Sequence, residues 1–338
     1  MSRKFTIKEI ALQAGLSSAT VDRALHGREN VRQLTRDRVA AALAELEAQY
    51  AASTLGGTRL TIDIFAQAPS RFTFAIRAAF EAELPLMRPA AFRARFHMAE
   101  IMEEREMVAR LRAIARRGSD GILLKAPATP AIEDCLVELA SRRIPVVTYV
   151  TDVAAPLRLA YVGMENRRAG ATAAYLTHRM CAGRAPRILI TLSSHMFLGE
   201  DQRRQGFIEY LTRHAPHLST TTISEGFGVN RTTGALTLKA LDTHRDIACV
   251  YSSGGGNAAI LDAFAKAGRR IDVFAAHDLD RTNRDLLRKG ALSFVIHHDF
   301  RQDARRAALH FAKHYRLVPG DVEIGTTEIG IACPVDIT

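Results

Sequence analysis

Hydroxyl-bearing and basic side chains lie together in a short stretch near the N-terminus of the 338-residue chain. In a helix they would share one face, opposite an apolar face formed by Val21, Ala24 and Leu25. Small and hydroxylated side chains let a helix approach a DNA groove, helix N-termini and hydroxyls bind phosphate, and arginine binds guanine or phosphate. The residues that would provide this chemistry, beside the acidic Asp22, are Ser17, Ser18, Ala19, Thr20 and Arg23. They predict DNA binding, and a helical bundle that contacts another protein is the alternative.

Three short helices would position these side chains. Thr6 and Glu9 form a capping box that starts a first helix, and Gly15 supplies the residue that ends it. Ser17 caps a second short helix, and a third helix starts near Thr35. The short connection between the first two helices forces a sharp corner, which is typical of a helix-turn-helix.

This N-terminal region resembles the DNA-binding head of LacI-type bacterial repressors, in the run TIKEIALQAGLSSATVDRALHG and in the following VRQLTRDRVAAALAEL. The resemblance implies phosphate contacts near Thr6, Ser17 and Thr20, and base reading by Ser18, Ala19 and Arg23. Two positions depart from the family pattern, because Asp22 stands where a serine is usual and His26 where an asparagine is usual. The added carboxylate should weaken generic DNA affinity and predicts an operator that differs from the common palindromes.

The segment after the third helix departs further from the family pattern. LacI-type heads usually continue with Gly-Tyr-x-Pro-Asn and a hinge helix whose leucine wedges into the minor groove, but the proline and asparagine are missing here. Leu55 is the candidate for the wedge, and an ordinary linker residue is the alternative. Gly56 and Gly57 mark a boundary. We therefore predict a head over 1–48, a hinge or linker over 49–58 and a core over 59–338.

Apolar strand-like runs alternate with amphipathic stretches throughout the core. The predicted strands are Leu60–Phe65, Ala94–Met98, Gly121–Leu124, Pro145–Val150, Arg187–Leu192, Thr220–Ser224, Ile247–Tyr251, Asp272–Ala276 and Ser293–Ile296. The predicted helices are Ile76–Leu84, Met102–Arg116, Ala131–Ser141, Ala169–Cys181, Arg204–Arg213, Thr233–Leu241, Ala258–Ala267 and Thr282–Leu287. This alternation predicts an α/β core of two parallel-sheet lobes behind the all-α head. The chain would change lobe near Leu159–Gly163 and cross back near 292–297.

Several polar and aromatic residues follow the predicted strands, where α/β proteins place their ligands. A polyhydroxyl ligand needs acceptors, donors and an apolar face on which to stack. The acceptor Asp152 and the amide Asn257 offer the first two, and a glycine turn that allows helix packing is the alternative for Asn257. The candidates for stacking are Phe72 or Phe74, and Phe227, with core packing as the alternative. Lys125 and His298 also occupy strand ends and rank lowest.

The core also resembles the periplasmic-binding-protein-like effector domain of LacI-type regulators. The matching segments are Asp120–Leu123, Ile144–Val147, Tyr161–Gly170, Arg203–Phe207 and His277–Leu279. By this resemblance Arg203 and Asp278 bind the effector across the cleft, and a structural salt bridge between them is the alternative. The resemblance also implies that the protein is not an enzyme.

Other chemistries lack their sequence signatures. The chain contains no phosphate-binding loop of the Gly-x4-Gly-Lys-Ser/Thr type, and no GxGxxG follows the first strand. The triplet Ser193-Ser194-His195 suggests a nucleophile, but no Gly-x-Ser-x-Gly elbow surrounds it. Histidines are scattered, and the four cysteines lie far apart without a CxxC pair, so we expect no metal, no cofactor and free thiols.

Composition and charge restrict the setting. The net charge of +10 favours polyanionic partners or simple solubility. No stretch is long and apolar enough to span a membrane, and Lys8 and Glu9 interrupt any secretory leader. We therefore expect a cytoplasmic protein with no membrane partner.

These features predict a ligand-responsive transcriptional regulator, a repressor that binds a palindromic DNA operator as a homodimer and a sugar or polyol between its lobes. One alternative is a cytoplasmic small-molecule-binding protein with a degenerate DNA-binding head, which Asp22 and the altered hinge would explain. A sugar-modifying enzyme that uses Ser194 and His195 is a third hypothesis.

Overall fold

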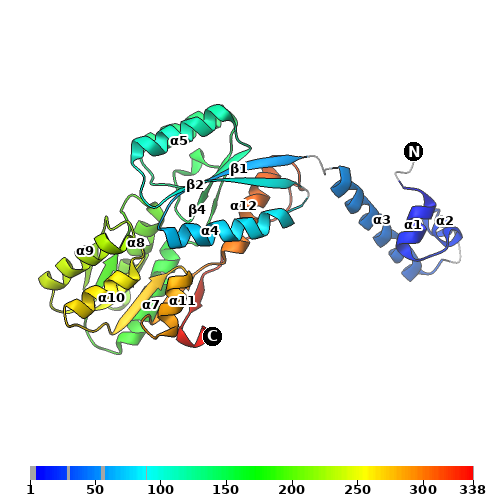
Figure 1. Cartoon of the computed structure of the whole chain (residues 1–338). Helices are drawn as coiled ribbons and strands as arrows, with labels where there is room; N and C mark the ends of the chain where they lie inside the picture. The colour runs from blue at the N-terminus through cyan, green and yellow to red at the C-terminus, as the bar shows by residue number, and fades with distance from the viewer. Residues whose placement is uncertain (1–4, 29–30, 55–57, 89, 338) are drawn as a thin grey trace. The chain divides into compact units, whose positions relative to one another are not determined.

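The computed structural model describes residues 5–28, 31–54, 58–88 and 90–337 (Figure 1). Contacts within the chain divide it into two units, residues 1–59 with 88–91, and residues 60–87 with 92–338. Within the described part of the chain, no helix is long and apolar enough to cross a membrane.

The first unit is a small helical head. Helices α1 (Ile7–Ala14) and α2 (Ser18–Leu25) form the predicted corner, and α3 (Gln33–Thr54) packs against both of them. The capping box of α1 is present, since the amide of Thr6 donates to Glu9 Oε2 at 2.7 Å and the amide of Glu9 donates to Thr6 Oγ1 at 3.3 Å. A small apolar core joins the three helices, and its buried members are Phe5, Ile10, Ala11, Val21 and Val39.

Helix α3 extends further than the sequence predicts. It continues through residues 49–54, which the sequence assigns to a hinge or linker. Gln49, Ala51 and Ala52 favour a helix, and neither proline nor glycine interrupts it before Thr54. Leu55, the wedge candidate, lies outside the described residues.

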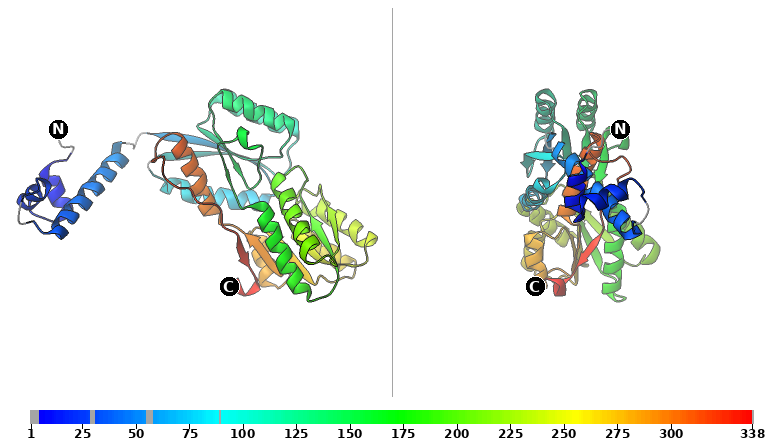
Figure 2. Two further views of the ribbon diagram at one scale, coloured as in Figure 1. Left: turned by 180° about the vertical axis from the view of Figure 1, so that it is seen from behind. Right: turned by 90° about the vertical axis from the view of Figure 1, so that its right-hand side faces the viewer.

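The second unit contains two lobes, each built on a twisted sheet with helices on both of its faces (Figure 2). The first sheet has the order β2-β1-β3-β4-β5 and the second has the order β11-β10-β9-β8-β6-β7. The strands are β1 (Arg59–Gln67), β2 (Ala91–Ala99), β3 (Gly121–Lys125), β4 (Val146–Tyr149), β5 (Ala160–Val162), β6 (Arg187–Thr191), β7 (Thr220–Ile223), β8 (Ile247–Ser252), β9 (Val273–His277), β10 (Phe294–His297) and β11 (Gly330–Ala332). Strands β1, β3, β4 and β5 pair in parallel, as do β6 to β10, whereas β11 is antiparallel to β10.

The helices of this unit follow the strands in the expected alternation. They are α4 (Ser70–Glu83), α5 (Glu104–Arg117), α6 (Pro130–Ser141), α7 (Asn166–Cys181), α8 (Leu198–His214), α9 (Asn230–Thr243), α10 (Asn257–Lys266), α11 (Arg281–Arg288) and α12 (Phe300–His314). In the second lobe, one apolar cluster joins α7 and α8 to one face of the sheet, and another joins α9, α10 and α11 to the opposite face. The strands are therefore apolar on both sides, which accounts for their nearly continuous apolar runs.

The sequence does not predict two of the strands, one of the α-helices and one of the crossings between the lobes. Strands β5 and β11 have only three residues each, too few to show a recognisable pattern, and α12 was not predicted. The first crossing between lobes follows β5, which still pairs with β4 in the first sheet. The chain returns after β10, because α12 packs on α4 and β5, and it then crosses a third time to reach β11.

Candidate functional site

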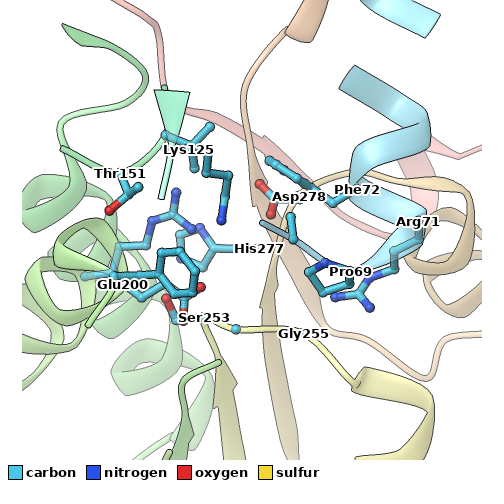
Figure 3. A pocket seen from close by; sticks show the side chains of 15 residues that line it. Pro69, Arg71, Phe72, Lys125, Thr151, Glu200, Ser253, Gly255, His277 and Asp278 are labelled. Carbon is cyan, nitrogen blue, oxygen red and sulfur yellow. The ribbon is translucent and has the colours of Figure 1, made fainter. Parts of the chain in front are cut away.

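A cavity lies between the two lobes, at the carboxyl ends of their strands (Figure 3). Lys125 ends β3, Thr151 follows β4, Ser253 follows β8, and Asp278 follows β9. The N-terminal parts of α4 and α8 complete the wall with Arg71, Phe72, Phe197, Glu200 and Arg203. Residues far apart in the sequence thus converge because parallel strands end at one edge of each sheet.

Arg203 is held in the wall although it is only 2% exposed. Its Nε donates to Oδ1 of Asn166 at 2.8 Å, across the contact between α8 and α7. That contact is close because glycine stands on both helices. A Cβ at Gly170 would lie 1.9 Å from the carbonyl oxygen of Arg203, and a Cβ at Gly206 would lie 1.9 Å from that of Arg167. Two reciprocal glycines therefore fix the position from which Arg203 reaches the cavity.

Lys125 is the second buried cation of the cavity. Its Nζ donates to the carbonyl of Gln67 at 3.2 Å and lies 4.2 Å from the ring centre of Phe197 and 5.6 Å from that of Phe72. Burial lowers the pKa of Lys125. Among the described residues, neither Lys125 nor Arg203 has an ion-pair partner within 4 Å. Both cations thus have donor capacity left for a ligand.

Two carboxylates provide acceptors. Glu200 accepts hydrogen bonds of 2.6 Å from both the amide and the hydroxyl of Ser193, and burial raises the pKa of Glu200. Oδ1 of Asp278 lies 3.8 Å from Nε2 of His298, and neither atom has a hydrogen-bond partner within the described part of the chain. Nδ1 of His298 pairs with the buried Asp303, so its ring orientation is set. Acceptors, donors and aromatic rings around one cavity suit a ligand that carries several hydroxyl groups.

The structure brings three of the predicted effector residues to the cavity wall, namely Arg203, Asp278 and Phe72. Asp152 is engaged elsewhere, because Arg158 donates to its two oxygens at 2.6 and 2.8 Å. Phe74 is 71% exposed on α4. Phe227 and Asn257 do not line the cavity either. The amide of Phe227 donates to the carbonyl of Ser193, and Asn257 lines a neighbouring groove.

Sequence reasoning missed several lining residues. Lys125 and His298 were ranked lowest, yet one lines the cavity and the other adjoins Asp278. Arg71 and Glu200 were not singled out, although each follows a predicted strand by a short distance. The rule that ligands bind at strand ends could have identified Arg71. No sequence pattern, however, shows whether a side chain in a loop or in the first turn of a helix points into the cavity.

The predicted DNA-contacting residues lie on the outer face of α2. Ser17, Ser18, Ala19 and Arg23 are exposed and Thr20 is half-buried, whereas Val21 faces the head core. Ser17 also caps the helix, since its Oγ accepts from the amide of Thr20 at 3.2 Å. Thr6 is exposed at the start of α1, where its hydroxyl takes part in the capping box.

The residues of the enzyme hypothesis do not form a catalytic pair. Ser194 is 1% exposed, and its Oγ accepts a hydrogen bond from the amide of Met196 at 3.2 Å. His195 is exposed, and its Nδ1 lies 3.9 Å from Oδ1 of Asp201. In the part of the chain that the structure describes, no cluster of histidine, cysteine or acidic residues could hold a metal ion.

Two family models match the chain. The periplasmic binding protein domain matches residues 100–315, and the lacI family of bacterial regulatory proteins matches residues 6–50. The first match includes the cavity residues from Lys125 to Asp278 but not those at the start of α4, and the second covers α1, α2 and most of α3. No curated protein sequence matches the chain.

Solved structures match the fold of the second unit. GanP, a glucose-galactose binding protein from Geobacillus stearothermophilus, aligns over 83% of this chain and 98% of its own at 18% identity, with a TM-score of 0.73. A putative LacI transcriptional regulator from Bacteroides fragilis aligns over 83% and 99% at 15% identity, with a TM-score of 0.72. A solute binding protein of an ABC transporter from Agrobacterium vitis, bound with alpha-D-tagatopyranose, aligns over 83% and 96% at 18% identity, with a TM-score of 0.72.

Proposed function

The chain belongs to the periplasmic binding protein domain family and carries the head of the lacI family of regulators, and from this premise we propose that it is a sugar- or polyol-responsive repressor. As a ligand-responsive DNA-binding regulator it has DNA and a small-molecule effector as partners. We propose that the effector is a sugar or polyol, that the protein represses transcription, and that it acts as a dimer in the cytoplasm. The protein binds the ligand without converting it chemically.

The cavity between the lobes is the observation that carries the proposal. Lys125 and Arg203 offer donors, Asp278 offers an acceptor, and Phe72 and Phe197 offer aromatic surface. Hydroxyl groups accept from the cations and donate to the carboxylate, while the ring face of a sugar packs on an aromatic side chain. Sugars named for two proteins of similar fold, glucose-galactose and tagatopyranose, support the same class.

Ligand binding would change DNA affinity through the arrangement of the two lobes. A ligand that contacts both lobes favours the closed arrangement, and it shifts DNA affinity only if the two lobe arrangements hold the heads differently. Such coupling is typically worth about 1–3 kcal/mol. One head reads half of a short site, so two heads on a two-fold dimer would read a near-palindrome.

The test is a mobility-shift titration of the full chain against the DNA upstream of its own coding sequence. We expect sequence-selective binding that weakens steeply with salt, and its loss in the variant Arg23→Ala. A thermal-shift screen with sugars and polyols tests the effector class, because a ligand that binds the native state raises Tm. The absence of any selective, salt-sensitive DNA binding would defeat the proposal.

A further inference from the structure

Arg71 joins the two lobes at one end of the cavity (Figure 3). It lies in the first turn of α4 in the first lobe, and its Nε is 2.9 Å from Oδ2 of Asp280 in the second lobe. Its Nη1 also donates to the carbonyl of Gly228 at 3.3 Å. The side chain of Asp280 is only 2% exposed, and its other oxygen accepts from the amide of Asn283 at 2.9 Å. The guanidinium is thus held by groups that are themselves fixed.

The glycine loop after β8 is shaped around this guanidinium. Gly255 has φ of +87°, and a Cβ there would lie 1.7 Å from Nη2 of Arg71. A Cβ at Gly228, where φ is +65°, would lie 2.4 Å from the carbonyl oxygen of Gly254. The loop and the arginine can therefore pack together only because these positions lack side chains.

A second hollow lies on the other side of Arg71. This outer groove is lined by Arg71 itself and by Ser70, Glu100, Asn230, Asn257 and Asn283. Asn257 is 4% exposed, and its Oδ1 lacks a hydrogen-bond partner within the described part of the chain. Arg71 therefore lines both the cavity and the outer groove. The cavity suits a hydroxylated ligand, and the groove is lined by amide and hydroxyl groups.

We propose that Arg71 is the residue that limits the length of the effector, so that the cavity accepts a single sugar ring or a polyol of that size and excludes a second ring. The proposal rests on the proposed function, because it assumes a hydroxylated ligand between the lobes. Arg71, held by its ion pair with Asp280, lines both the cavity and the outer groove, and we infer that its guanidinium separates them. Removing the guanidinium joins the two hollows, and the polar groove then receives the second ring of a longer ligand.

A measurement without any ligand tests the barrier itself. Ser253 lines the cavity and is 4% exposed, so Ser253→Cys in a Cys333→Ser background places a thiol behind Arg71 while the other three cysteines stay buried. We expect iodoacetamide to modify this thiol roughly tenfold faster after Arg71→Ala. Arg77→Ala is the matched control, since Arg77 lies on the same helix and is 45% exposed. Equal rates in the Arg71→Ala variant and in its parent would overturn the proposal.

A second measurement tests the length limit. Glucose and galactose are compared with maltose, cellobiose, lactose and melibiose by thermal shift, in the native sequence and in Arg71→Ala. We expect a monosaccharide alone to raise Tm of the native sequence, and a disaccharide that contains it to raise Tm of the variant as well. A disaccharide that stabilises the native sequence as much as its monosaccharide would overturn the length limit. If none of these sugars acts, glucose and galactose are not effectors, and the thiol measurement still decides whether Arg71 is the barrier.

Discussion

Oδ1 of Asp22 lies 3.0 Å from Nδ1 of His26, one helical turn further along α2. These are the two positions at which the head departs from the LacI-type pattern, so the two departures contact each other. Nη1 of Arg28 lies 3.7 Å from the other oxygen of Asp22. The neighbouring basic groups limit the repulsion between this carboxylate and DNA phosphates. The same contact holds Arg28 at Asp22, so that Arg28 is not directed toward phosphate.

Replacing this carboxylate should strengthen DNA binding. The variant Asp22→Ser removes a negative charge and releases Arg28 toward phosphate, and we expect affinity for operator DNA to rise about fivefold at moderate salt. The measurement is fluorescence anisotropy at several salt concentrations. Asp37→Ser makes the same charge change on α3, where Asp37 accepts a hydrogen bond from Gln33 at 2.8 Å. An equal gain in both variants would show that net charge, and not the position on α2, is responsible.

The cavity residues Arg203 and Asp278 should carry the ligand response. We expect Arg203→Ala and Asp278→Ala each to abolish the effect of the effector on DNA binding while the head keeps its affinity. The physical reason is that each substitution leaves ligand hydroxyls and cavity groups without partners, at a cost of about 1–3 kcal/mol or more per lost charged hydrogen bond. Titration calorimetry and mobility shifts measure the two effects separately. Asp152→Ala is the control, because Asp152 pairs with Arg158 away from the cavity wall. Unchanged ligand affinity in both cavity variants would refute their assignment.

The close contact of α7 and α8 should not tolerate a methyl group. In Gly206→Ala the new Cβ meets the carbonyl oxygen of Arg167, so the helices must separate, and we expect a loss of about 1–3 kcal/mol in the free energy of unfolding. The shift also moves Arg203, three residues away on α8, so ligand affinity should fall as well.

Gly234→Ala is a matched control for that substitution. Gly234 lies inside α9, and its added Cβ would make only ordinary contacts, the nearest at 3.4 Å to Ala259. We expect this variant to be as stable as the native chain or more stable by about 0.5–1 kcal/mol, because alanine favours the helix. Urea unfolding of both variants checks the comparison. Equal losses at the two positions would contradict the role assigned to the glycine pair.

The sequence predicts those parts of the fold that repeat a strong local pattern. The capping box of Thr6 and Glu9 and the apolar runs of β3 and β8 were recognised because local spacing determines them. Strand β5 escaped detection because three residues show no periodicity, and it is a strand only because β4 offers its edge. The linker assigned to 49–58 was set by comparison with a family pattern, whereas helix propensity extends α3 to Thr54.

The candidate site shows the same division. Arg203 and Asp278 were predicted by resemblance, and Phe72 by its place after a strand. Lys125 ranks lowest among the strand-end candidates, and its burial depends on the carbonyl of Gln67 and the rings of Phe72 and Phe197, which long-range packing brings together. Asp152 satisfied the same strand-end rule as Lys125, but the nearby Arg158 draws it away, and no local pattern distinguishes the two outcomes.

Asp63 should make the first lobe sensitive to acid. This carboxylate on β1 is fully buried, and it accepts hydrogen bonds from Arg95 at 2.6 and 3.0 Å, from His97 at 2.7 Å and from Arg117 at 2.6 Å. Burial alone would raise the pKa of Asp63, but the hydrogen bonds from His97 and Arg95 outweigh it and the pKa is lowered. A carboxyl whose pKa is lower in the folded state stabilises the fold above its unfolded pKa of about 4, and this contribution is lost as pH falls below that value.

Asp63→Asn should therefore cost stability at neutral pH and remove part of the acid dependence. We expect a loss of about 3–5 kcal/mol at pH 7, because Arg95 and Arg117 lose a buried partner, and a smaller difference from the native chain below pH 4. Urea unfolding at a series of pH values measures both effects. Asp285→Asn removes a half-exposed carboxylate that pairs with Arg288 at 2.7 Å, and it should change stability by less than about 1 kcal/mol. If the difference between Asp63→Asn and the native chain did not shrink at low pH, the buried carboxylate would not be the source of the acid sensitivity.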